Sequence, residues 1–101
     1  MKHVIPHTLL PALAKKVTDR AFEEYRNEYA EYHPLLAWTS EQRAQVSFRV
    51  KGILLEGWLG ISDRNIELDL DAPFIFRIFQ RKAIEVIDRE VRRWIDRADT
   101  L

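Results

Sequence analysis

The fold is decided by residues 43–71, which read RAQVSFRVKGILLEGWLGISDRNIELDLD. Apolar and polar side chains alternate in three runs of this stretch, at residues 44–50, 53–61 and 66–70. A period of two residues is typical of strands that are buried on one face. The stretch therefore predicts a three-stranded antiparallel meander whose apolar face the rest of the chain must cover.

The turns of the meander predict its register. A two-residue Lys51-Gly52 loop is typical of a tight hairpin and fixes which residues lie opposite each other. The predicted pairs are Val50 with Ile53, Phe48 with Leu55, Val46 with Gly57, Ala44 with Leu59, Ile61 with Ile66, Leu59 with Leu68 and Gly57 with Leu70. Both hairpins place Gly57 mid-sheet, where a glycine lets the sheet bend or a helix approach closely.

The opposite face of the meander is predicted to be polar and wet. Its charged residues are Arg49, Glu56, Glu67, Asp69 and Asp71. Leu54 and Trp58 are the large apolar side chains among them. A self-complementary patch around Trp58 would favour a homodimer in which a second subunit covers the indole.

Amphipathic patterns on either side of the meander predict two helices. Apolar residues with a period of 3.6 predict one helix over about residues 9–31, with Thr8 as its N-cap and Pro11 in its first turn. A second pattern predicts a helix over about residues 75–97. Further strands are predicted at residues 2–6 and 35–39.

These elements predict one α+β domain over residues 1–101. It has a single antiparallel sheet of four to five strands, in the order β-α-β-β-β-β-α, with two helices packed on one face.

Charge and composition exclude several classes of function. The 101 residues include 16 basic and 16 acidic side chains, so no general positive field attracts nucleic acid. The chain has no cysteine, and no apolar run approaches the ~18 residues of a membrane span. We therefore expect a cytoplasmic protein that binds no nucleic acid, metal or cofactor. The three histidines are expected on the surface.

No residue pattern predicts catalysis. The chain has neither a glycine-rich phosphate loop nor a nucleophile elbow. Glu56, Asp69 and Asp71 form a carboxylate cluster, but on the open face of the sheet, where water solvates them. We expect that the protein is not an enzyme.

The segment at residues 74–79 is apolar on every side. Phe74, Phe76 and Phe79 are interleaved with Ile75 and Ile78, and one buried helical stripe cannot hide them all. They either plug the open end of the sheet or form an exposed contact surface. The residues predicted to contact a ligand or partner are Trp38, Phe74, Phe76 and Phe79, at this mouth of the sheet, and Trp58 on the polar face.

Several short motifs resemble those of a known family. They are Lys2-His3 with Ile5-Pro6-His7, Ala14-Lys15-Lys16, Trp38, Val46-Ser47-Phe48 with Val50-Lys51-Gly52, Leu68-Asp69-Leu70, and Pro73-Phe74 with Phe76-Arg77. On these motifs the chain is similar to the small bacterial polyhydroxyalkanoic acid system, or granule-region, proteins. That resemblance implies a link to polyhydroxyalkanoate metabolism or granules and brings no catalytic residues. The order of elements also resembles a trimmed helix-grip fold, which implies an apolar ligand between helix and sheet.

Two functions follow from these observations. The first is a non-enzymatic accessory protein at the granule surface that makes hydrophobic contact with polymer, acyl chains or a granule protein. The alternative is a small carrier that holds an apolar or acyl ligand between the C-terminal helix and Phe48, Leu55 and Leu68. A chain of this length is expected to leave little room for a cavity of ~300 Å³ or more.

Overall fold

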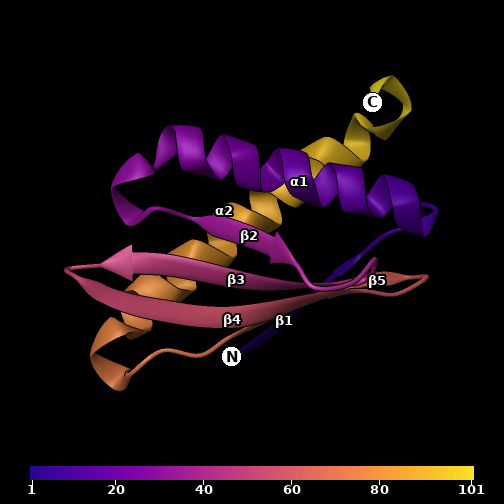
Figure 1. The fold of residues 1–101 in the computed structure, drawn as a ribbon. Coiled ribbons are helices and arrows are strands. Elements are labelled where there is room, and N and C mark those ends of the chain that lie inside the picture. Colours follow the sequence, from indigo (N-terminus) through magenta and orange to yellow (C-terminus); the bar gives the residue numbers. More distant parts are fainter.

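A five-stranded antiparallel sheet forms one layer of the protein and two long helices form the other, as the computed structural model of residues 1–101 shows (Figure 1). The strands are β1 (Lys2–Pro6), β2 (Leu35–Trp38), β3 (Arg43–Val50), β4 (Ile53–Ile61) and β5 (Asn65–Leu70). The helices are α1 (Pro11–Glu28) and α2 (Arg77–Asp96), with 3₁₀ turns η1 (Ala30–Tyr32), η2 (Phe74–Phe76) and η3 (Ala98–Thr100). The strands lie in the order β1-β5-β4-β3-β2, so the predicted fold class and element order are confirmed.

The register of the meander is the predicted one. Val46 of β3 lies opposite Gly57 of β4, and Gly57 lies opposite Leu70 of β5. Lys51 and Gly52 form the tight turn, with φ angles of 53° and 80°. A type I′ hairpin turn requires positive φ at both central residues, because its twist then matches that of the flanking strands.

Gly57 allows a close approach of two strands. A Cβ atom on this residue would lie 2.4 Å from the backbone oxygen of Asp69 and 3.0 Å from the Cα of Leu70. The element that approaches is therefore β5, whereas the sequence left open a covering helix or a bend of the sheet.

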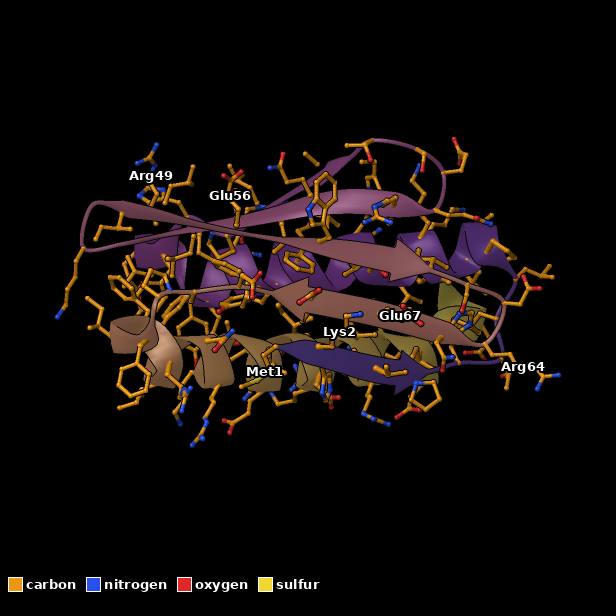
Figure 2. The ribbon with its side chains drawn as sticks, turned by 90° about the horizontal axis from the view of Figure 1, so that it is seen from below. Met1, Lys2, Arg49, Glu56, Arg64 and Glu67 are labelled. Carbon is orange, nitrogen blue, oxygen red and sulfur yellow. The ribbon has the colours of Figure 1, made fainter.

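Both helices cover the same face of the sheet, as predicted, and Figure 2 shows them behind the strands when the sheet is viewed from its other side. The apolar residues of the meander and of α1 and α2 form a single core beneath them. The face toward the viewer in Figure 2 carries Arg49, Glu56 and Glu67, with Leu54 and Trp58 about half exposed. This polar face is also the predicted one.

The start of α1 differs from the prediction. The helix begins at Pro11 with Leu10 as its N-cap, and Thr8 does not cap it. His7 explains the shift, because its backbone N–H donates to the Arg64 carbonyl at 2.8 Å and its ring lies 2.8 Å from the Ser62 carbonyl. Tied to the β4–β5 turn in this way, the chain at His7 cannot enter a helix. His7 is therefore buried, and the expectation that it lies on the surface is wrong.

The other helix boundaries also move inward. α1 ends at Glu28, and after η1 the chain turns at His33, which has a φ of 46°. A residue that precedes proline disfavours the right-handed helical region, so Pro34 ends the helical stretch. At the other end of the chain, residues 74–76 form the tighter η2 turn before α2 begins at Arg77.

Candidate functional site

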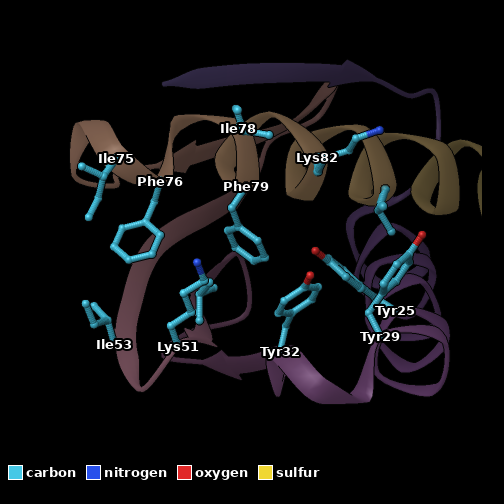
Figure 3. Close-up of a pocket in the computed structure, with 12 residues that line it drawn as sticks. Tyr25, Tyr29, Tyr32, Lys51, Ile53, Ile75, Phe76, Ile78, Phe79 and Lys82 are labelled. Carbon is cyan, nitrogen blue, oxygen red and sulfur yellow. The ribbon is translucent and has the colours of Figure 1, made fainter.

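A groove of about 740 Å³ opens at the end of the molecule where the β3–β4 hairpin turns (Figure 3). Three segments that are distant in sequence form it: the end of α1 with η1, the tip of the hairpin, and η2 with the start of α2. Ten of its twelve lining residues are hydrophobic. They are Tyr25, Tyr29, Tyr32, Val50, Ile53, Ile75, Phe76, Ile78, Phe79 and Val86, together with Lys51 and Lys82.

Aromatic side chains build one wall of the groove. The ring of Phe79 packs edge-on against Tyr32 and Phe48, with centroid distances of 4.9 and 5.6 Å. Tyr25 packs against Phe48 at 5.5 Å and against Tyr29 at 5.5 Å. Edge-on and tilted pairs of this kind are favourable, so the wall is already formed without a ligand.

The residues of α2 that face the groove follow the helical repeat. Ile78, Lys82 and Val86 lie four residues apart along one side of the helix, with Phe79 beside them. Ile78 is 78% exposed and Ile75 is 80% exposed, so the groove has an apolar rim as well as an apolar interior. Monomeric proteins rarely leave such side chains together in water unless the patch binds something.

Few polar groups enter the groove. They are the hydroxyls of three tyrosines and the amines of Lys51 and Lys82. Burial, with the neighbouring Tyr29, Tyr32 and Glu31 adding smaller effects, raises the pKa of the Tyr25 hydroxyl well above its usual range. Tyr25 is therefore a neutral hydrogen-bonding group at physiological pH. An apolar lining with a few oriented polar groups is typical of small-molecule sites of this volume, ~300–1,000 Å³.

The predicted contact residues divide among four places. Phe76 and Phe79 line the groove, Phe76 buried and Phe79 half-buried. Phe74 is 74% exposed, but it lies beside Met1 and Gln80 on another side of α2. The guanidinium of Arg77 covers its ring at 4.7 Å.

Both tryptophans lie away from the groove. Trp38 pairs with Ala44, at the opposite end of β3 from Val50, so its predicted place at the mouth with the phenylalanines is wrong. Its indole N–H donates to Asp19 of α1 at 2.7 Å, which explains its position as a link between β2 and α1. Trp58 lies on the outer face of the sheet, where the guanidinium of Arg43 is 5.1 Å from its ring centre.

The groove is not where a carrier site was expected. Phe48, Leu55 and Leu68 are buried in the core, and none of them lines the groove. The rings of Tyr25 and Phe79 fill the space above Phe48. Space remains at the end of the sheet instead, as a groove that is open to solvent.

Sequence reasoning missed most of the lining residues. Tyr25 and Tyr29 fall on the apolar stripe of the helix predicted over about residues 9–31, and Tyr32 follows them after α1 ends. The sequence did contain one indication of this wall, because Tyr25, Tyr29 and Tyr32 are spaced by four and three residues. Like residues 74–79, this segment has more aromatic residues than one buried helical stripe needs. Neither surplus alone shows that the two face each other across a groove.

The carboxylates singled out from the sequence do not form a closed site. Glu56 accepts a hydrogen bond from Gln45 at 2.5 Å on the outer face. Asp69 and Asp71 lie 3.6 and 3.7 Å from the amino group of Met1. Glu56 and Asp69 lie on the outer face of the sheet, away from both helices, and Asp71 is exposed to water just after β5.

Comparison with protein-family models identifies the relatives of this chain. The model described as "Putative polyhydroxyalkanoic acid system protein" matches residues 4–95, which is nearly the whole fold. The chain belongs to this family. The groove-lining segments all fall within the matched range. Comparisons with curated proteins and with solved structures gave no match. No helix of this family member has the length and apolar character needed to cross a membrane.

Proposed function

We propose that this member of the polyhydroxyalkanoic acid system family is a non-enzymatic accessory protein that binds acyl chains in the groove between η1, the β3–β4 hairpin and α2. The observation that carries the proposal is the groove itself, with ten hydrophobic residues among twelve. The family supplies a matching chemistry, since polyhydroxyalkanoate is a polymer of hydroxyacyl units. Its alkyl side chains are apolar groups of the kind that such a groove would shelter from water.

The energetics favour this kind of ligand. Each methylene group that leaves water contributes about 0.8 kcal/mol, so affinity should rise with every methylene of the alkyl chain that the groove buries. The aromatic wall adds no ordering cost of its own, because Tyr25, Phe48 and Phe79 are already packed in place.

The exposed rim favours a role at the granule. Ile75 and Ile78 project from the first turn of α2 and its approach, and together with the groove they form one apolar end of the molecule. A second candidate function is therefore adhesion through this rim alone, with no chain entering the groove. A cytoplasmic location at the granule surface fits both candidates.

A substitution at the rim tests the proposal. Ile78→Asp places a charge where an acyl chain would lie and should leave stability intact, since the side chain is 78% exposed. Leu10→Asp is the matched control, because Leu10 is equally exposed but lies at the start of α1. We expect Ile78→Asp to lower both the affinity for a fluorescent fatty-acid analogue and the fraction of protein that co-sediments with polymer granules. Leu10→Asp should lower neither.

A second variant separates the two candidates. Val86→Trp adds bulk to the buried floor of the groove and leaves the rim unchanged; because Val86 is also part of the core, a cooperative thermal melt must first show that the variant folds. Acyl-chain binding lost with granule binding retained would support adhesion through the rim. A wild-type protein that binds neither acyl chains nor granules would overturn both.

A further inference from the structure

We infer that the acyl ligand of this groove ends in a carboxylate, and that Lys51 binds that carboxylate. The inference rests on the proposed function and adds the chemical class of the ligand. Both a free hydroxyalkanoic acid and the carboxyl end of a polyester chain have this chemistry, whereas the interior of the polymer does not.

The position of Lys51 carries the first step. The residue sits in the hairpin turn at the tip of β3 and β4, and Figure 3 shows its side chain extending into the groove, toward Phe76 and Phe79. Apolar rings therefore flank the amine on the groove side. A charge beside apolar surface is less well screened than one in open water, so it attracts an opposite charge more strongly.

Lys51 also has no partner within the protein. The ion pairs of the chain employ other cations, and Lys51 belongs to none of them. Lys82, the other amine of the groove, lies 3.9 Å from Glu85, and in Figure 3 its nitrogen points away from the hairpin. Lys51 is thus the free cation of the groove.

The surrounding charges favour an anion as well. The first turn of α2 contains no acidic residue, and Lys82 is the basic side chain of this helix that lines the groove, whereas Arg77 and Arg81 lie on the other side of the helix beside Phe74. The N-terminal end of a helix adds a partial positive charge of its own. Glu31 of η1 is the acidic group on the tyrosine side, and it is exposed to water.

An acid with a hydrocarbon tail satisfies both features at once. Its carboxylate would meet the Lys51 amine at the hairpin, and its tail would lie along Phe76, Phe79 and Val86. The tyrosine hydroxyls of the groove are then available to a hydroxyl group on the chain. An uncharged ester would gain the apolar contacts but not the ion pair.

Calorimetric titration with matched ligands tests the inference. The ligands are 3-hydroxydecanoate and its methyl ester, which share one tail and differ in charge. We expect the wild type to bind the acid about tenfold more tightly than the ester, equivalent to ~1.4 kcal/mol. Lys51→Gln should reduce acid binding to the level of the ester, while Lys51→Arg should keep the preference for the acid.

The control is Lys16→Gln, which removes an exposed, unpaired lysine from α1 and should leave both affinities unchanged. Equal affinities of the wild type for acid and ester would overturn the inference and leave the proposed function standing. Failure to bind either ligand would overturn both. If the wild type prefers the acid, titration with a hydroxyalkanoate oligomer that has a free carboxyl end distinguishes the two possible ligands. Tight binding of the oligomer identifies the end of a polymer chain as the ligand, and weak binding identifies a free acid.

Discussion

The backbone of β5 passes so close to Gly57 that a side chain on this residue would collide with main-chain atoms, which cannot rotate away. We expect Gly57→Ala to destabilise the protein by about 1–3 kcal/mol, the usual cost of overpacking. The matched control is Gly60→Ala in the same strand, where a Cβ atom would meet only the Gln42 carbonyl at 3.9 Å. Urea unfolding of both variants checks the prediction, and equal midpoints would contradict it.

Asp88 joins β1 to α2. Its carboxylate lies 2.5 Å from the Nε2 atom of His3 and accepts a hydrogen bond from Arg92 at 2.8 Å. Burial alone would raise the pKa of Asp88, but the hydrogen bonds and charges of His3 and Arg92 outweigh that effect and lower it. The ionised carboxylate is therefore favoured in the folded state.

A lowered pKa in the folded state makes stability depend on pH in a definite direction. The contribution of Asp88 is complete above the unfolded-state pKa, about 3.9, and is lost as the pH falls through the lower folded-state value. We expect Asp88→Asn to be less stable than the wild type at pH 7, and the difference to shrink below about pH 4. Urea titrations at several pH values measure it; a difference that stayed constant down to pH 3 would refute the assignment.

Among the elements, the β3–β4 hairpin has a turn residue poorly suited to its backbone. Lys51 has a φ of 53°, a region in which asparagine is more favourable than lysine. We expect Lys51→Asn to raise the free energy of unfolding by up to about 1 kcal/mol while it weakens acid binding. Chemical denaturation of this variant measures its free energy of unfolding, and ligand titration measures its affinity for the acid. A variant that lost stability would show that lysine suits this turn.

The elements that the sequence predicted well are those whose geometry is local. Alternation and two short turns define the meander, so the register around Gly57 could be worked out completely. The start of α1 was predicted wrongly because the decisive hydrogen bonds join His7 to Ser62 and Arg64, far along the chain. No local pattern reports such a contact.

The groove escaped prediction for the same reason. Each of its three walls comes from a segment with more apolar residues than that segment alone can bury. Only the packing of α1, α2 and the hairpin brings the three segments together. Phe76 and Phe79 were identified because their segment is apolar on every side. Trp38 was misplaced because an isolated tryptophan on a short strand does not reveal which end of the sheet it occupies.

For the molecule as a whole, the polar face of the sheet takes no part in the groove and is available for contact with a second subunit. Val4, Leu54 and Trp58 are each 43–49% exposed on it, among charges of both signs. If two subunits pair through this face, Trp58→Lys should convert dimers to monomers in sedimentation velocity experiments. A wild type that sediments as a monomer at high concentration would exclude the pairing.

The position of β1 at the sheet edge, beside β5, bears on the order in which the chain folds. Ile5 lies opposite Ile66, so this pairing must close a loop that spans more than half of the chain, whereas Ile61 reaches the same Ile66 through a short turn. Contacts that close long loops form late, because the chain loses conformational entropy on closing the loop before the contact energy compensates for it. A newly made chain would therefore hold β5 as an unpaired edge until β1 docks.

Matched substitutions expose that delay in folding kinetics. Ile5→Val and Ile61→Val each remove one buried methylene beside Ile66, at a cost of about 0.5–1.5 kcal/mol. We expect Ile5→Val to accelerate unfolding with little effect on the folding rate, and Ile61→Val to slow folding. Stopped-flow measurements give both rates. Equal effects on folding would mean that β1 is already docked in the transition state, and β5 would then never spend time as an open edge that could recruit a second chain.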